Sequence, residues 1–154
     1  MFRAFPDLRP FLDPTRVVTL SGMLSKREIL VAVARSFATH PAIGDHRGWL
    51  KALYDREDVT STGIGGGIAI PHAQHPSIRE FALAIARCPY GVDFAAKDGQ
   101  PVRLLVMMAA PPDDRPTYLK VLAGIAARLN NTKVMEAVLA AGDPHAVIDA
   151  FVAT

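Results

Sequence analysis

Residues 62–72 read TGIGGGIAIPH, a glycine-rich turn followed by a short apolar run that ends in proline and histidine. Four glycines within five positions give a backbone that can adopt positive φ and approach a ligand closely. The apolar run Ile68 to Ile70 predicts a short buried strand, which Pro71 is expected to close. Because proline also constrains its neighbours, we expect His72 to leave the sheet in a defined direction, which makes it the first candidate for chemistry.

His72 has the side chain that phosphoryl transfer needs, because neutral imidazole keeps a nucleophilic lone pair near its ordinary pKa of about 6.5. A nearby arginine would hold phosphate oxygens with its planar cationic fork, and hydroxyls and glycine amides would donate further hydrogen bonds. The candidate phosphate-binding groups upstream of the histidine are Arg56, Ser61, Thr62, Gly63 and Gly65.

Several segments, in the same order along the chain, resemble the enzyme IIA domains of the fructose, mannitol and nitrogen-regulatory phosphotransferase family. They are most like the nitrogen-regulatory branch. The matching residues are Arg56-Glu57, STGIG at 61–65, GIAIPHA at 67–73, Asp93-Phe94, DGQPV at 98–102 and AAP at 109–111. The resemblance covers nearly the whole chain. It implies that His72 accepts a phosphoryl group from a histidine phosphocarrier protein, either HPr or its nitrogen-branch counterpart. It also implies a downstream acceptor domain, or a regulated target protein that reads the phosphorylation state.

The chain departs from the family pattern at Tyr118, where family members usually carry a second histidine followed by leucine. A tyrosine hydroxyl can donate a hydrogen bond to a phosphate oxygen. With an ordinary pKa of about 10, however, it cannot alternate between neutral and cationic forms near neutral pH. We therefore expect Tyr118 to join His72 and Arg56 in the catalytic set, with an altered rate or direction of transfer. Two lesser departures, Thr60 and Arg103, do not change the candidate nucleophile.

Three functional alternatives stay open. The resemblance favours a phosphotransferase, in the sense of a phosphoryl carrier of the phosphotransferase system, that serves regulation as in the nitrogen-regulatory branch. The second alternative is a fructose- or mannitol-type carrier for sugar uptake. The third is a binding module that keeps the fold but transfers phosphate poorly because Tyr118 replaces the second histidine.

The composition is that of an ordinary globular domain: 154 residues, 50% of them hydrophobic and 21% charged, with a formal net charge of +2. The charges form no like-charged run, which argues against nucleic-acid binding. No apolar stretch is long enough to span a membrane, and Met1 to Pro10 lacks the apolar stretch of a signal peptide. The single cysteine, Cys88, fits a reducing compartment. We therefore expect a cytoplasmic protein without membrane insertion.

Neither a metal nor an organic cofactor is predicted. His72 and His75 have a metal-like spacing, but Pro71 and Pro76 disfavour a helix there, and no carboxylate or thiol cluster accompanies them. His75 is expected to be a solvated loop residue. The glycines precede a strand rather than follow one, and no Lys-Ser or Lys-Thr pair ends the run, so the pattern is not that of a nucleotide-binding loop.

The order of apolar patterns predicts an α/β sandwich, with a small mixed β-sheet flanked by helices, as a single enzyme IIA type-2 domain over residues 1–154. Strands are expected at 17–20, 68–70, 81–88 and 102–110, and helices at 25–39, after 45, at about 116–129, at 132–141 and after 143. Ser25 and Glu28 have capping-box spacing, and Pro89-Tyr90-Gly91 is expected to turn the chain. Tyr118 would lie in the first turn of its helix, which favours a nearby anion.

Overall fold

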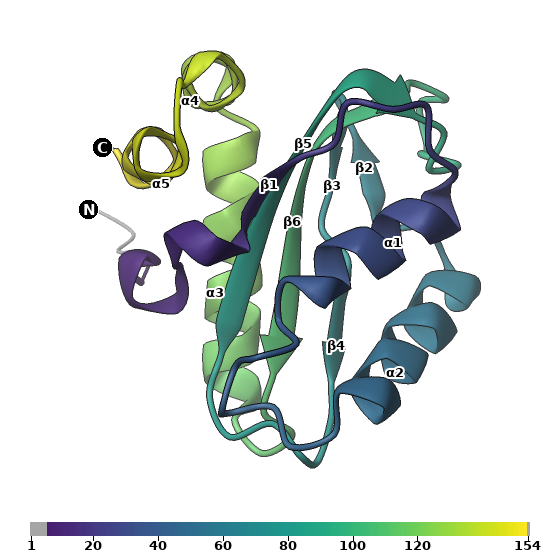
Figure 1. The fold of residues 1–154 in the computed structure, drawn as a ribbon, viewed down its shortest axis with the longest axis vertical. Helices are drawn as coiled ribbons and strands as arrows, with labels where there is room; N and C mark the ends of the chain where they lie inside the picture. Colours follow the sequence, from purple (N-terminus) through teal and green to yellow (C-terminus); the bar gives the residue numbers. More distant parts are fainter. Residues whose placement is uncertain (1–5, 154) are drawn as a thin grey trace.

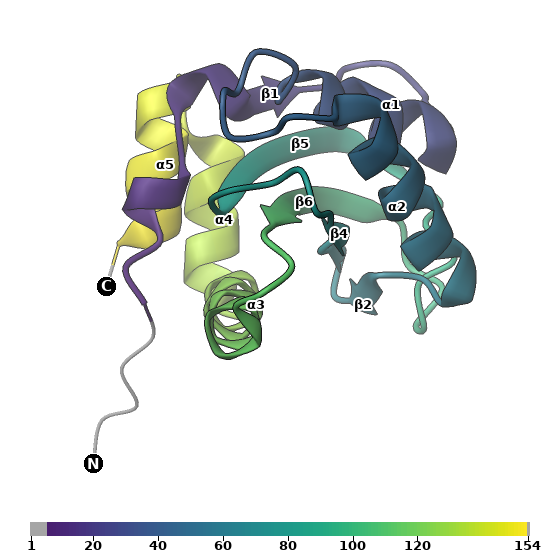
Figure 2. The ribbon, with the colours of Figure 1, turned by 90° about the horizontal axis from the view of Figure 1, so that it is seen from below.

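The computed structural model describes residues 6–153, so positions 1–5 and 154 of the predicted domain lie outside the described residues. Within residues 6–153, a six-stranded mixed sheet lies between two layers of helices (Figures 1 and 2), which confirms the predicted α/β sandwich. The strands are β1 (Val17–Thr19), β2 (Gly63–Gly65), β3 (Ile68–Ala69), β4 (His72–Gln74), β5 (Ala82–Val92) and β6 (Val102–Ala110). The α-helices are α1 (Lys26–Arg35), α2 (His46–Val59), α3 (Arg115–Leu129), α4 (Thr132–Ala140) and α5 (Pro144–Val152). Two short 3-10 helices, Arg9–Phe11 and Pro14–Arg16, precede β1 and were not predicted.

The sheet is built around the antiparallel pair β5 and β6. The strand order is β1-β5-β6-β3-β2, and β4 also pairs with β6. β1 adds to β5 in parallel, β3 and β4 add to β6 in parallel, and β2 closes the edge antiparallel to β3. β3 and β4 pair with successive parts of β6, so the glycine-rich segment and His72 lie along the same edge of that strand.

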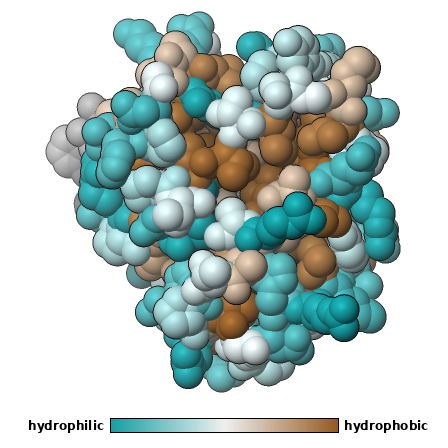
Figure 3. All heavy atoms as spheres, in the orientation of Figure 1, coloured by the Kyte–Doolittle hydropathy of each residue, from teal (hydrophilic) through white to brown (hydrophobic). Residues whose placement is uncertain are grey.

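Both faces of the central strands are buried, and the two faces have different side chains. Leu83, Ile85, Leu104, Val106 and Met108 pack towards α3, α4 and α5. The alternate positions pack towards α1 and α2, and most of them are small: Ala82, Ala84, Ala86, Leu105, Met107 and Ala109. This period of two follows from the pleat of the strands, and each fully buried large aliphatic side chain stabilises the fold by about 1.5–3 kcal/mol. On the side that carries α1 and α2, hydrophobic side chains gather in the upper half of the view, and hydrophilic side chains cover much of the rest (Figure 3).

The helix starts follow the expected capping chemistry. Ser25 and Glu28 form the predicted capping box at the start of α1. Asp45 accepts a hydrogen bond from the Gly48 amide at the start of α2, and Asp143 caps α5. α1 ends at Arg35, before the predicted end at residue 39. The reason is that the following amides bond three residues back, which tightens the chain into turns.

The prediction that the chain leaves the sheet after Pro71 is wrong. Ala69 pairs with Leu105, and three residues later His72 pairs with Met108, so the register along β6 is unbroken. Pro71 has no N–H and interrupts the ladder, yet its carbonyl still accepts from the Met108 amide at 2.9 Å. His72 therefore begins a second short strand instead of a loop.

Two further expectations about turns need correction. Pro89-Tyr90-Gly91 does not turn the chain: these residues stay within β5, where the pairing is irregular between Arg87 and Val92. Such a bulge accommodates proline without ending the strand. The glycine-rich segment was expected as a turn, and the turn is shorter than expected, because Gly63–Gly65 forms an edge strand that a tight turn joins to β3. Gly66 and Gly67 in that turn have φ of +67° and +82°, which side chains disfavour.

Candidate functional site

The ring of His72 is held by one backbone carbonyl. Its Nδ1 lies 2.7 Å from the carbonyl oxygen of Ile70, at the start of β4. A carbonyl only accepts, so Nδ1 carries the proton and donates it, and Nε2 keeps its lone pair. The side chain is half-buried and lies on the α3 side of the sheet, where its ring meets that of Tyr118. Nε2 is thus the ring nitrogen that keeps a free lone pair.

The surroundings of His72 favour its neutral form. Burial lowers the pKa of the imidazole, and the charge of Arg56 lowers it further. The Ile70 carbonyl and the Glu57 carboxylate act in the opposite direction, but the pKa still lies below its ordinary value. The imidazole is therefore neutral near neutral pH, with the proton on Nδ1 and a free lone pair on Nε2.

A pocket of about 490 Å³ opens beside His72. It is lined by residues from the end of α2, the following loop, β2, the sheet, the β5–β6 loop and one face of α3. These residues are Arg56, Thr60, Ser61, Thr62, Gly63, Ile64, Ile70, His72, Lys97, Leu122, Ala123 and Ala126. The fold thus brings five of the predicted site residues to one cavity.

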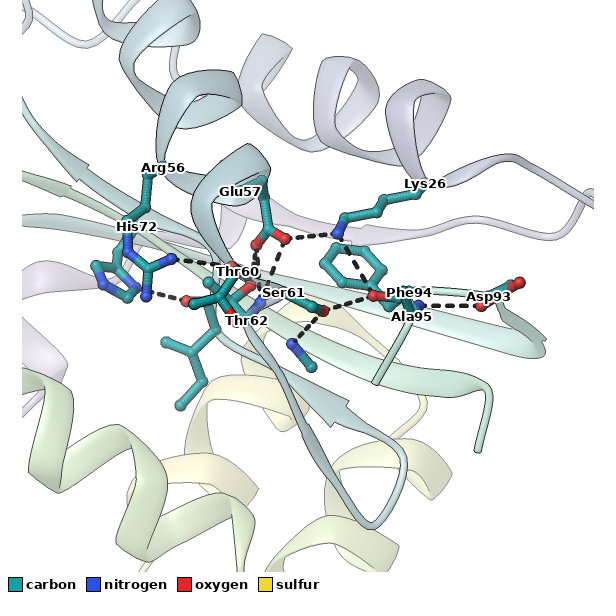
Figure 4. A network of polar contacts seen from close by, with 12 residues as sticks. Lys26, Arg56, Glu57, Thr60, Ser61, Thr62, His72, Asp93, Phe94 and Ala95 are labelled. Atoms are coloured by element: carbon teal, nitrogen blue, oxygen red, sulfur yellow. Dashed lines mark hydrogen bonds and ion pairs between the residues drawn. The ribbon is translucent and has the colours of Figure 1, made fainter. Parts of the chain in front are cut away.

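Arg56 comes from the last turn of α2, and its guanidinium lies next to the His72 ring (Figure 4). Its Nη1 donates to the carbonyl oxygen of Thr60 at 3.0 Å, a bond that also closes the carboxyl end of the helix. A guanidinium has five N–H donors, so further donors remain beyond this one bond. Arg56 therefore combines a fixed position with donors suited to phosphate oxygens.

The hydroxyls of Ser61 and Thr62 both donate to acceptors within the protein. Ser61 Oγ donates to the carbonyl of Phe94 at 2.5 Å and accepts from the Gly63 amide at 3.0 Å. The hydroxyl and the amide of Thr62 both donate to the carboxylate of Glu57. In this structure the two side chains hold the glycine-rich segment in place, and their predicted contact with phosphate stays a prediction.

Glu57 is the buried acceptor at the centre of this network (Figure 4). Its side chain is 4% exposed and forms an ion pair with Lys26 of α1, with 2.7 Å between Nζ and Oε2. Lys26 also lies 4.7 Å from the centre of the Phe94 ring. From the sequence, Glu57 was expected only as part of the Arg56-Glu57 motif. A carboxylate facing inward from an amphipathic helix was the available signal that it needed a buried partner.

Gly65 lies at the turn end of β2 and does not line the pocket. Its φ is +95°, and a Cβ built there would lie 3.2 Å from the carboxylate of Asp98. The same carboxylate accepts from the Gly66 amide at 2.9 Å. The turn amide next to Gly65 is thus bonded to a protein carboxylate, and a phosphate contact by Gly65 stays a prediction.

Tyr118 lies in the first turn of α3, as predicted, and its ring centre is 5.9 Å from that of His72 in an edge-on arrangement. Asp114 caps the helix by accepting from the Thr117 amide at 3.2 Å. Burial raises the pKa of the Tyr118 hydroxyl, so the phenol stays protonated near neutral pH and can donate. The residue at this position can thus pack on the histidine and offer a hydrogen bond, without carrying positive charge.

The other histidines lie apart from the site. His75 is not a freely solvated loop residue, because its Nδ1 lies 2.8 Å from Ser77 Oγ and its side chain is 20% exposed. His46 contacts the carbonyl of Ala34, and His40 faces Glu80. Within residues 6–153 no group of three or more histidine, cysteine, aspartate or glutamate side chains could hold a metal ion. In the same part of the chain no helix is long and apolar enough to cross a membrane.

The sequence is similar to those of known phosphotransferase proteins. The model of the family "Phosphoenolpyruvate-dependent sugar phosphotransferase system, EIIA 2" matches residues 10–153. The chain is 35% identical to a fructose-specific EIIA component of Haloferax volcanii, over 90% of each protein. It is 33% identical to a nitrogen regulatory protein of Pseudomonas aeruginosa, over 84% of each. A fructose-specific EIIABC component of Bacillus subtilis is 37% identical over 70% of this chain, which spans 17% of that longer protein.

The fold is also similar to solved structures. The nitrogen regulatory protein IIA-Ntr of Neisseria meningitidis superimposes with a TM-score of 0.84 and 25% identity, over 92% of this chain and 97% of that one. A complex of enzyme IIA and phosphorylated enzyme IIB for mannitol from Escherichia coli gives a TM-score of 0.77 at 18% identity, over 93% of this chain and 98% of that one. The second likeness concerns the fold alone.

Proposed function

Because the chain belongs to the EIIA 2 family of the phosphoenolpyruvate-dependent sugar phosphotransferase system, we propose that His72 is the phosphoryl-accepting residue of this carrier. The observation that carries the proposal is the bond from Nδ1 of His72 to the Ile70 carbonyl, inside a pocket that also contains Arg56. It leaves Nε2 free and unprotonated at the place where an arginine can hold an anion. The proposed domain is the whole chain, residues 1–154.

The transfer step moves one phosphoryl group between two imidazoles. The lone pair of His72 Nε2 attacks the phosphorus of a phosphohistidine on the donor, a new N–P bond forms, and the donor's N–P bond breaks. The donor ring carries a proton on its other nitrogen, so it leaves as a neutral imidazole when the electron pair of the broken bond returns to it. The His72 ring becomes cationic, and the Ile70 carbonyl stabilises that charge through the proton on Nδ1. Arg56 stabilises the charge on the three transferring oxygens.

The donor is proposed to be a histidine phosphocarrier protein, HPr or its nitrogen-branch counterpart. The surface around the pocket suits a protein partner, because Ile64 and Leu119 are large hydrophobic residues that remain 43% and 50% exposed. Tyr118 and Leu119 come from the same turn of α3, and Ile64 comes from β2. Two imidazoles must approach closely for transfer, so a shared apolar rim around His72 would seat the donor.

We propose that the phosphorylation state serves regulation, as the name of the similar nitrogen regulatory proteins indicates for them. The STGIG run at 61–65 and the TM-score of 0.84 support this branch. A sugar-uptake role remains the second candidate, because the fructose-specific component of Haloferax volcanii is similar to the same extent. A cytoplasmic location is proposed with either role, since the phosphoryl donor would be a cytoplasmic protein.

The proposal is tested by intact-mass analysis after incubation with phosphoenolpyruvate, enzyme I and a histidine phosphocarrier. Wild type should gain one acid-labile phosphate, and His72→Ala should gain none while keeping its circular dichroism and melting temperature. Full labelling of His72→Ala would move the site elsewhere. No label on wild type, with a control enzyme IIA labelled in the same mixture, would favour the binding-module alternative that Tyr118 suggested. Passing the label to a sugar-specific acceptor domain would support sugar uptake over regulation.

A further inference from the structure

The loop between β5 and β6 is tied to the glycine-rich segment on both sides of Lys97. Before Lys97, the Phe94 carbonyl accepts from Ser61 Oγ at 2.5 Å, and Lys26 Nζ lies 3.4 Å from the same oxygen. After it, the Asp98 carboxylate accepts from the Gly66 amide at 2.9 Å. Lys97 is therefore carried by a stretch of backbone that the glycine-rich segment itself positions.

The contact between the loop and Gly63 is unusually close. A Cβ built on Gly63 would lie 2.9 Å from the Cβ of Ala96, so a side chain at Gly63 would push the loop away. The loop has an internal geometry that fits this approach: Ala95 has a φ of +52°, and the Gly99 amide donates to the Ala96 carbonyl at 3.0 Å. A residue other than glycine is rarely left-handed, and such backbone persists where neighbouring contacts hold it.

Lys97 reaches the same pocket as His72 and Arg56. The residue is exposed overall, and within residues 6–153 its ammonium makes neither an ion pair nor a side-chain hydrogen bond. The other lysine near the glycine-rich segment, Lys26, is already paired with Glu57. Lys97 is thus a lysine that lines the pocket and has donors available to a ligand.

The neutral donors of the glycine-rich segment are largely used within the protein. Ser61 donates to Phe94, Thr62 donates to Glu57 with both its hydroxyl and its amide, and the Gly63 amide donates to Ser61. A phosphoryl group in the pocket therefore depends on charged donors for much of its stabilisation. The cations that line the pocket are Arg56 and Lys97.

We infer that Lys97 is a second cationic ligand of the phosphoryl group at His72. It comes from the loop between β5 and β6, whereas Arg56 comes from α2. This inference rests on the proposed function. The ammonium forms no covalent bond in the step: it stays protonated and donates hydrogen bonds to the transferring oxygens while the N–P bonds exchange. It supplies positive charge in a site where Tyr118, unlike an imidazolium, supplies none.

The test compares Lys97→Gln and Lys97→Arg with Lys133→Gln, which removes the same charge from an exposed position on α4 outside the pocket. The first measurement is the single-turnover rate of phosphoryl transfer from the phosphorylated carrier protein. We expect Lys97→Gln to be slower by about tenfold, Lys97→Arg to keep most of the rate, and Lys133→Gln to match wild type. The second is a titration of unphosphorylated protein with inorganic phosphate, followed by the NMR shifts of the His72 ring. In this titration the Kd for inorganic phosphate should be about threefold higher for Lys97→Gln than for Lys133→Gln.

The two measurements separate this inference from the proposed function. If wild type is phosphorylated and Lys97→Gln matches Lys133→Gln in both rate and Kd, Lys97 is not a ligand, while the carrier role of His72 stands. If wild type accepts no phosphoryl group but phosphate binding still depends on Lys97, the anion ligand stands and the carrier role falls. If wild type neither accepts a phosphoryl group nor shifts with phosphate, both are overturned.

Discussion

Replacing Glu57 by alanine is predicted to destabilise the fold strongly, because this side chain is the buried acceptor for four donor contacts. The Glu57 carboxylate pairs with Lys26 at 2.7 Å and accepts from the amide and hydroxyl of Thr62. Removing one partner of a buried pair costs about 3–5 kcal/mol. Lys26 is 26% exposed and would keep its contacts with Phe94, which places the expected cost near the lower end, about 3 kcal/mol. For a chain of this size that is a fall in Tm of about 6–12 °C.

The assay is thermal and urea unfolding of Glu57→Ala beside Asp55→Ala, a matched control on the same helix. Asp55 pairs with Lys51 at the same distance, 2.7 Å, but both side chains are well exposed, at 62% and 75%. We expect no resolved change in Tm for the control. The double variant Lys26→Met/Glu57→Ala should be more stable than the sum of the single effects predicts, because no unpaired charge remains buried. A Tm of Glu57→Ala equal to that of the control, or an additive double variant, would refute the account of the network.

Three further predictions concern the reaction. Arg56→Ala should slow phosphoryl transfer by about 10²–10³-fold, and Arg56→Lys should restore only part of the rate because the planar fork is lost. The control is Arg47→Ala, which changes an exposed arginine on the same helix. Equal transfer rates for Arg56→Ala and Arg47→Ala would mean that Arg56 only bonds the Thr60 carbonyl and does not assist transfer. Tyr118→Phe should slow transfer about tenfold, because it removes the hydroxyl that donates to the phosphoryl group, whereas Tyr118→His should transfer at least as fast as wild type. Equal transfer rates for wild type, Tyr118→Phe and Tyr118→His would mean that the side chain at position 118 only packs against His72. Finally, NMR titration should give His72 a pKa below 6.5, since burial disfavours the cation. The unfolded chain then binds a proton more readily than the folded protein, so His72 lowers the stability of the fold as the pH falls from above 6.5 to below its folded-state pKa. A titration midpoint of His72 at or above 6.5 would contradict the burial argument.

The elements that local patterns define could be predicted from the sequence. β6 has the predicted bounds because its nine residues are apolar nearly throughout and Pro111 follows them. The capping box at Ser25 and the Asp143-Pro144 start of α5 also follow from neighbouring residues alone. The meeting of Arg56 and His72 in one pocket was expected from the motif.

What failed depended on partners distant in the sequence. β3 does end before Pro71, but His72 was expected to leave the sheet, and it stays because β6 supplies a continuous partner on both sides of Pro71. The bonds from Thr62 to Glu57, and the ion pair of Glu57 with Lys26 of another helix, were not foreseen, while the contact of Thr62 with phosphate stays a prediction. Lys97 was missed because its segment reaches the pocket only through contacts with Ser61, Gly63 and Gly66. Periodicity and spacing describe one element at a time and do not specify such contacts.

The central claim is that the Ile70 carbonyl fixes the His72 ring so that Nε2 receives the phosphoryl group. A long-range ¹H–¹⁵N correlation spectrum of histidine-labelled protein tests it most directly, with the His72 signals assigned by comparison with His72→Gln. The account predicts a proton on Nδ1 and none on Nε2 before phosphorylation, and afterwards phosphorus coupling at Nε2 with the Nδ1 proton retained. A free ring protonated on Nε2, or a phosphoryl group on Nδ1, would contradict it.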